Sequence, residues 1–102
     1  MRGLAGLQRW LYPFAVQLVR QFPQLQVTSV RRSYYQQLAL YQAALAGASR
    51  YPAARPGYSY HELGRAFDLV GPHAILQAAG QTWESWGGEW GARFGDPIHF
   101  QA

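Results

Sequence analysis

The chain has 102 residues, enough for one domain with one hydrophobic core. Hydrophobic residues make up 49% of it and aromatic residues 16%, which excludes a disordered chain, and the absence of cysteine excludes disulfides and thiolate metal sites. The net charge of +4 is carried by arginine alone, and every acidic residue lies at or after Glu62. This asymmetry favours an anionic partner such as nucleic acid, a membrane or a cell-wall polymer.

The first 22 residues carry an apolar stripe at helical spacing. Because Pro13 removes a backbone donor and clashes with the preceding turn, we expect a break or kink near Tyr12. Pro23 ends the segment, and the loosely alternating, β-branched run Gln24–Val30 predicts a strand. No signal peptide or membrane span is recognisable near Met1, so delivery elsewhere would need another route or a longer parent protein. The stripe comprises Leu4, Leu7, Leu11, Phe14, Leu18 and Phe22.

A second helix is predicted from about Tyr34 to about Ala46. Ser33 is a good N-cap before it, and Gly47 is a plausible C-terminal stop. Residues 48–60 contain two prolines and a glycine, so they predict a loop, and their arginine, tyrosine and serine residues make it a candidate substrate-facing element. The apolar face of the helix would consist of Leu38, Tyr41, Ala44 and Leu45.

The second half predicts two strands and one short helix. Residues Arg65–Val70 alternate as a strand that turns Asp68 away from Phe67 and Leu69, with Gly64 allowing a tight bend before it. A helix is expected from about Pro72 to Ala79, ended by Gly80. Residues 98–101 predict the final strand.

Two histidines and two carboxylates form the candidate site. His61 and Asp68 are seven residues apart, and Asp96 precedes the distant His99 by three. Two imidazoles and one carboxylate with an open fourth position are typical of catalytic zinc sites. A spare carboxylate can then handle the proton of a water molecule. The helical HExxH motif is absent, and this spacing alone also fits structural histidines.

Four segments, in order, resemble the bacterial zinc D-Ala-D-Ala carboxypeptidase and L-Ala-D-Glu endopeptidase family. That family includes VanY-like enzymes of vancomycin resistance and phage endolysin peptidases, and it is related to Hedgehog-type domains. The resemblance extends from about residue 24 to the end of the chain. The segments are Arg32-Ser33-x-x-x-Gln37-x-x-Leu40-Tyr41, Ser59-x-His61-x-x-Gly64-x-Ala66-x-Asp68, Trp86-Gly87-Gly88-Glu89-Trp90 and Asp96-Pro97-Ile98-His99-Phe100-Gln101.

The resemblance implies one α+β domain over residues 1–102, a small antiparallel sheet flanked by helices in the Hedgehog and DD-peptidase fold. It implies a Zn²⁺ ion held by three ligands and hydrolysis of peptidoglycan stem peptides by a monomer. The implied residues are His61, Asp68 and His99 as metal ligands, Asp96 and Arg32 as catalytic residues, and Ser59, Gln37 and Tyr60 as substrate-binding residues.

Several residues keep a second interpretation. Asp68 could form a buried salt bridge with Arg32 or Arg65, and Glu89 is the rival to Asp96 as general base. His73 lacks a partner motif and is expected to be non-functional. The tryptophans at positions 83, 86 and 90 fit a core better than a carbohydrate platform.

The function we expect is L-Ala-D-Glu endopeptidase activity of the endolysin type, with a phage origin or a larger virion protein as its setting. The alternatives are a D-Ala-D-Ala carboxypeptidase and a zinc-containing wall-binding module without activity. Nucleic acid is not expected as a partner, because no groove-reading motif or RNA-binding signature accompanies the arginines.

Overall fold

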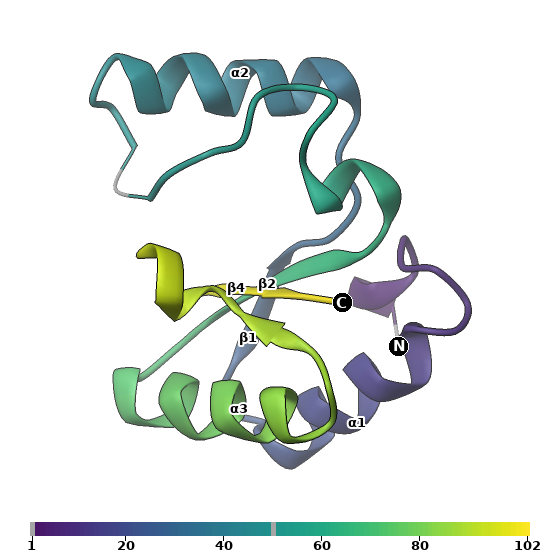
Figure 1. The fold of residues 1–102 in the computed structure, drawn as a ribbon. Helices are drawn as coiled ribbons and strands as arrows, with labels where there is room; N and C mark the ends of the chain where they lie inside the picture. Colours follow the sequence, from purple (N-terminus) through teal and green to yellow (C-terminus); the bar gives the residue numbers. More distant parts are fainter. Residues whose placement is uncertain (1, 50) are drawn as a thin grey trace.

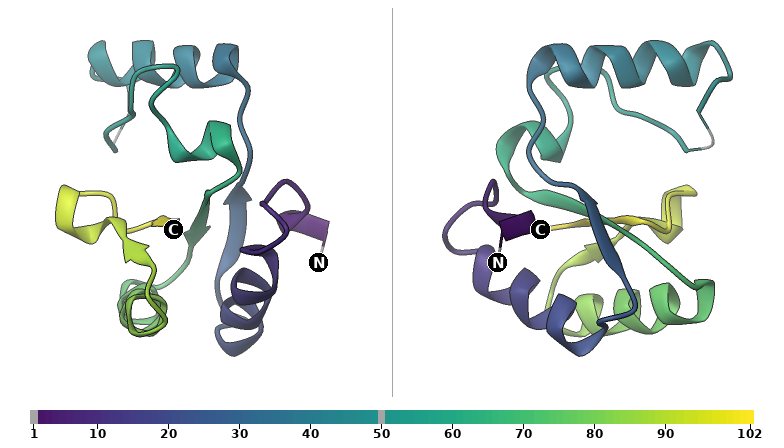
Figure 2. Two further views of the ribbon diagram at one scale, coloured as in Figure 1. Left: turned by 45° about the vertical axis from the view of Figure 1, so that its right-hand side comes forward. Right: turned by 180° about the vertical axis from the view of Figure 1, so that it is seen from behind.

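The computed structural model describes residues 2–49 and 51–102. Within them, α1 (Tyr12–Gln21) and α3 (His73–Ser85) lie on one side of an antiparallel sheet, and α2 (Tyr34–Leu45) lies on the other (Figures 1 and 2). The predicted α+β class with a small antiparallel sheet flanked by helices is therefore confirmed. No helix in the described part is both long enough and apolar enough to cross a membrane.

The sheet has the strand order β1-β2-β4-β3 within the described residues. Its central strand β2 pairs with β1 on one side and with β4 on the other, so segments distant in sequence meet there. Short 3-10 helices link the larger elements: η1 (Arg2–Leu4), η2 (Tyr60–Leu63) and η3 (Gly91–Phe94). The strands are β1 (Gln26–Ser29), β2 (Ala66–Val70), β3 (Glu89–Trp90) and β4 (His99–Gln101).

The two faces of β2 carry different kinds of side chain, apolar on one and polar on the other. Successive side chains of a strand point to opposite faces, so Phe67 and Leu69 enter the core formed with α1 and α3 while Asp68 points the other way. The Phe67 ring stacks on Phe100 of β4 and meets Trp83 of α3 edge to face. The predicted alternation is confirmed, and the apolar face fixes the register that brings the polar face together.

The expected break at Tyr12 is also confirmed. The helix α1 begins at Tyr12 with Pro13 in its first turn, where a missing amide hydrogen costs nothing. The preceding residues Leu4, Leu7 and Leu11 are buried, but Phe14 of the predicted stripe is 50% exposed. Ala15 and Leu18 complete the contact of α1 with the core, which leaves the Phe14 ring at its edge.

The helix α2 was predicted correctly in extent but not in packing. Ser33 caps it in a capping box with Gln36, as expected for its start. All twelve residues of α2 are described, and Gln37 is the one that is buried. Leu45, assigned to the apolar face, is 70% exposed, because α2 faces a cleft and not the hydrophobic core.

The end predicted for α3 at Gly80 is wrong, since the helix continues to Ser85. Gly80 serves a close approach instead: a Cβ atom there would lie 2.1 Å from Cδ2 of the Trp90 ring. Trp90 and Trp86 pack against the core and Trp83 belongs to it, so the tryptophan cluster is part of the packed interior. The glycine in this helix is therefore a packing device between α3 and β3.

Candidate metal centre

His61 lies in the 3-10 turn η2 and is 2% exposed. Ser59 Oγ accepts the His61 amide hydrogen at 3.2 Å, and Gly64, with φ of 68°, ends the turn in the left-handed region that glycine tolerates. The His61 Nδ1 atom lies 2.5 Å from the carbonyl oxygen of Val30. A carbonyl can only accept, so Nδ1 carries the proton, and Nε2 turns its lone pair toward Asp68 Oδ1 at 3.1 Å.

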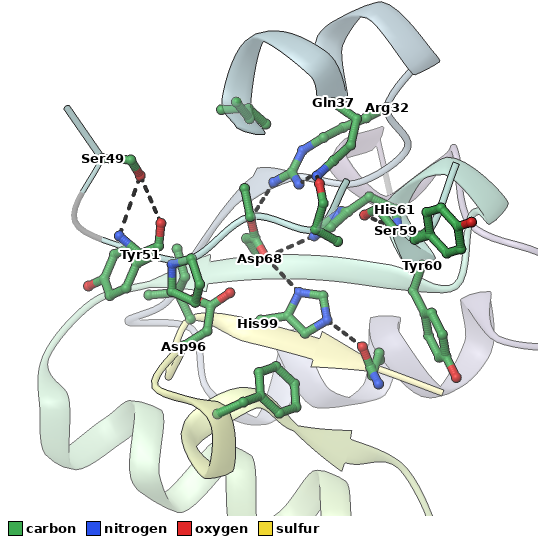
Figure 3. Close-up of a pocket in the computed structure, with 18 residues that line it drawn as sticks. Arg32, Gln37, Ser49, Tyr51, Ser59, Tyr60, His61, Asp68, Asp96 and His99 are labelled. Atoms are coloured by element: carbon green, nitrogen blue, oxygen red, sulfur yellow. Dashed lines mark hydrogen bonds and ion pairs between the residues drawn. The ribbon is translucent and has the colours of Figure 1, made fainter. Parts of the chain in front are cut away.

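Asp68 and His99 face each other across two paired strands. They are direct partners in the β2–β4 register, which places both side chains on the face opposite the core. His99 Nδ1 lies 3.5 Å from Asp68 Oδ1, and His99 Nε2 lies 2.6 Å from Gln101 Oε1 (Figure 3). The sheet thus brings the second imidazole to the same carboxylate oxygen that the first one approaches.

The three side chains have the geometry of a metal site. In residues 2–49 and 51–102 they are the one group of three or more potential ligands found together, with donor atoms within 4.8 Å of one another. Tetrahedral zinc about 2.0–2.2 Å from each donor separates the donors by about 3.3–3.5 Å, close to the 3.1 and 3.5 Å found for the two histidines and Asp68. Three electron-rich atoms that converge while buried repel one another unless a cation or protons lie between them, so these residues fit zinc.

The electrostatics of the three side chains agree with this picture. Burial opposes ionisation of Asp68, but its contacts with His61 and His99 and the positive charge of Arg32 outweigh it, so the pKa of Asp68 lies well below its usual range. Burial similarly opposes the charged form of His99, yet its contacts with Asp68 and Gln101 raise its pKa above the usual value. The carboxylate is therefore ready to act as an anionic ligand.

Arg32 lies between β1 and α2 and anchors this carboxylate. Its Nη2 donates to Asp68 Oδ2 at 2.8 Å, its Nε to Ser29 Oγ at 3.0 Å and its Nη1 to Gln37 Oε1 at 3.2 Å. An irregularity in β1 between Val27 and Ser29 brings Ser29 opposite Asp68. The salt bridge considered as an alternative for Asp68 therefore exists with Arg32, and it leaves Asp68 Oδ1 facing both histidines.

Asp96 stands on the turn before β4, close to the ligands. The His99 amide donates to the Asp96 carbonyl at 3.1 Å, and the Asp96 amide donates to the Gly91 carbonyl at 2.9 Å. Among the described residues, Oδ1 of Asp96 is the buried side-chain atom that lacks a hydrogen-bond partner. Burial raises the pKa of Asp96 above its ordinary value. An unsatisfied acceptor with raised basicity beside the three donors is suited to receive a proton from a bound molecule.

A cleft of about 410 Å³ opens over the site between the sheet and α2. Gln37, Ser59 and Tyr60 line it together with Arg32 and Asp96, as Figure 3 shows. Buried Gln37 also donates to the Ala54 carbonyl at 2.9 Å, which ties the loop of residues 48–60 to α2. The predicted substrate-facing loop does border the cleft. Sequence reasoning gave no role to three further lining residues, Phe94, Ile98 and Gln101.

The rival candidates lie elsewhere. Glu89 is exposed on β3, pairs with Gln101 in the register and is not among the residues that line the cleft. His73 is exposed at the start of α3.

The alternation of His99 and Gln101 along β4 was the sequence signal that could have identified Gln101 as a site residue, since residues two apart on a strand share a face.

Comparison with known proteins agrees with the fold and the site. The family model VanY, described as D-alanyl-D-alanine carboxypeptidase, matches residues 10–100. No curated protein matches the sequence significantly. Among solved structures, the chain is similar to the vancomycin resistance D,D-dipeptidase VanXYg, crystallised with a D-Ala-D-Ala phosphinate analogue. The TM-score is 0.73 at 18% identity, over 93% of this chain and 49% of that one.

Two further solved structures are similar. The L-Ala D-Glu endopeptidase ChiX from Serratia marcescens gives a TM-score of 0.67 at 24% identity, over 98% of this chain and 83% of that one. The LD-carboxypeptidase LdcB, whose structure concerns peptidoglycan recognition, gives 0.68 at 26% identity, over 94% and 65%. The chain thus spans about half the length of VanXYg and about two thirds of LdcB.

Proposed function

Because the chain belongs to the VanY family of D-alanyl-D-alanine carboxypeptidases, we propose that it is a zinc peptidase that hydrolyses peptide bonds in peptidoglycan stem peptides. The observation that carries the proposal is the convergence of His61 Nε2, His99 Nδ1 and Asp68 Oδ1 beneath a cleft. The other ring nitrogen of each histidine is already bonded to an acceptor, so these three atoms are free to bind one cation.

Zinc in such a site supplies Lewis acidity, which activates water and polarises a carbonyl at neutral pH. Asp96 is the proposed general base: its unpartnered Oδ1 accepts a proton from the attacking water, and the carboxyl then delivers it to the leaving amine. The raised pKa of Asp96 makes it a stronger proton acceptor than an exposed carboxylate. The Asp96 carboxylate thus holds the proton between its removal from water and its transfer to the leaving amine.

Arg32 is proposed to act at the same end of the cleft. Three of its nitrogens are engaged by Ser29, Gln37 and Asp68, so its guanidinium plane is fixed. A guanidinium has five N–H donors, and those left over would donate to the substrate carbonyl oxygen as negative charge develops on it. Ser59, Gln37 and Tyr60 are the proposed substrate contacts, since all three line the cleft.

We propose cleavage of the L-Ala-D-Glu bond. The salt bridge between Arg32 and Asp68 supports an endopeptidase, because Arg32 is the one lysine or arginine among the described lining residues and its charge is already paired. A carboxypeptidase would need a cation for the terminal carboxylate of its substrate. The segment Trp86–Trp90 and the similarity to ChiX support the same choice, and with it an endolysin-type, phage-encoded setting.

The D-Ala-D-Ala carboxypeptidase stays the second candidate because the family model carries that description. A non-catalytic wall-binding module is disfavoured, because both Asp96 and Arg32 are present at the cleft.

Mass spectrometry of digested peptidoglycan distinguishes these functions. An L-Ala-D-Glu endopeptidase releases stem peptides with a new amino terminus on D-Glu and leaves L-Ala on the sugar. A carboxypeptidase instead releases free D-Ala from intact stems. Protein treated with a chelator and the His61→Ala variant serve as controls. Zinc-loaded protein that releases neither product would contradict the proposed activity.

A further inference from the structure

Gln101 contacts the site without being a ligand. It lies on β4 two residues after His99, on the same face of the strand, and its Oε1 lies 2.6 Å from His99 Nε2. It also lines the cleft. Because the amide oxygen accepts, His99 must donate from Nε2 to make this bond, and its lone pair is then on Nδ1, the nitrogen that faces Asp68.

The two histidines are held in opposite tautomers by different kinds of partner. His61 donates from Nδ1 to the backbone carbonyl of Val30, a group that every residue at that position would supply. His99 has a side chain in the equivalent role, so its tautomer depends on which residue occupies position 101. The orientation of His61 therefore depends on a backbone group, whereas the orientation of His99 depends on the side chain at position 101.

The base of the Gln101 side chain is itself held in place. Nε1 of buried Trp83 donates to the Gln101 carbonyl at 2.9 Å, and the Gln101 residue is paired with Ala66 on β2 and Glu89 on β3. The backbone that carries the Gln101 side chain is therefore fixed beside His99. From this position the amide oxygen can orient the imidazole before a metal arrives.

We propose that Gln101 is a positioning residue that selects the Nε2-protonated tautomer of His99 and so presents Nδ1 to zinc. The inference rests on the metal site of the proposed function but not on hydrolysis. It concerns affinity for zinc, since a ligand that must change tautomer and turn before binding pays for that change in binding free energy.

Zinc affinity, measured by competition with a chromogenic chelator, tests the role of Gln101 without reference to activity. Gln101→Met keeps the length of the side chain and removes the acceptor, and we expect it to bind zinc about 10- to 100-fold more weakly than the wild type. Gln101→Glu restores an acceptor and should bind within a few-fold of the wild type or more tightly. Gln77→Met, on the exposed face of α3, is the matched control and should bind as the wild type does.

Long-range ¹H–¹⁵N spectra of the zinc-loaded wild type provide a second readout that needs no variant. We expect His99 to coordinate through Nδ1 and to show a protected Nε2 proton, and His61 to show the reverse. Wild-type zinc affinity in Gln101→Met, coordination of His99 through Nε2, or a protein that binds no zinc would overturn the inference. A protein that shows the expected affinities and spectra yet leaves peptidoglycan intact would overturn only the proposed function.

Discussion

Arg32 and Asp68 form a salt bridge of 2.8 Å that joins the cleft's arginine to one oxygen of a candidate metal ligand. The other oxygen of Asp68 faces the two histidines. A change at Arg32 would therefore act both on the proposed reaction and on the orientation of a candidate metal ligand.

Removal of Arg32 should weaken zinc binding as well as turnover. We expect Arg32→Ala to bind zinc about 10-fold or more weakly, because the partner that orients Asp68 is lost. Arg32→Lys should recover little, since one ammonium cannot reproduce the planar contacts to Ser29, Gln37 and Asp68. Arg20→Ala, on the exposed side of α1, is the control. Unchanged zinc affinity and hydrolysis in Arg32→Ala would remove Arg32 from the site.

Removal of the metal should destabilise the fold, because the site joins η2, β2 and β4. Zinc at 100 times its dissociation constant contributes about 2.7 kcal/mol to the free energy of unfolding. For a chain of this size that corresponds to a shift of roughly 10 °C or more in Tm. Thermal melts with and without a chelator measure the shift, and elemental analysis measures zinc content.

The ligand variants His61→Ala, Asp68→Ala and His99→Ala should bind little zinc and show no such shift. His73→Ala changes an exposed histidine outside the site and should keep the full shift. If the chelator changed neither the melting temperature nor the metal content of the wild type, this would contradict the proposed metal site.

The candidate ligands were accessible from the sequence through the resemblance of four ordered segments to a known family, because their spacing alone also fits structural histidines. Alternation along β2 turns Asp68 away from Phe67, and pairing of β2 with β4 then places His99 opposite it. The motif around His61 supplied the third candidate ligand. What remained hidden depends on tertiary contacts: Gly80 was interpreted as a helix end, but the space it leaves is filled by the ring of Trp90.

The packing of α2 was hidden for the same reason. Its spacing of apolar residues is helical, yet a spacing does not say whether the helix meets a core or a cleft, and here only Gln37 of its described residues is buried. Likewise, no local sequence pattern predicts that Trp90 Nε1 donates at 2.7 Å to the Pro97 carbonyl, next to Asp96. Such links come from the assembled fold.

The hydrogen bond from Trp90 to the Pro97 carbonyl leads to a prediction about Gly80. Alanine favours helix by about 1 kcal/mol over glycine, but overpacking a core costs about 1–3 kcal/mol. With Cβ only 2.1 Å from the Trp90 ring, overpacking should win in Gly80→Ala. We expect a lower Tm and, because Trp90 holds the turn that carries Asp96, reduced hydrolysis. Gln81→Ala, at an exposed position, should be neutral. A Gly80→Ala variant as stable as the wild type would contradict this packing account.

The last prediction assigns the general base to Asp96 and not to Glu89. Asp96 lines the cleft with an unpartnered buried oxygen, whereas Glu89 is exposed on β3 outside the lining residues. Asp96→Asn keeps the shape and removes the proton acceptor. It should leave zinc content and Tm nearly unchanged and lower turnover by at least the roughly 10²-fold typical of lost acid–base catalysis.

Glu89→Gln provides the comparison on a second carboxylate of the same protein. It should cost less turnover than Asp96→Asn, and any loss should follow weaker folding or metal retention, because Glu89 pairs with Gln101, the neighbour of His99 on its strand face. Zinc content, thermal melts and peptidoglycan hydrolysis measured side by side separate the two carboxylates. A nearly active Asp96→Asn beside a zinc-loaded but inactive Glu89→Gln would reverse the assignment.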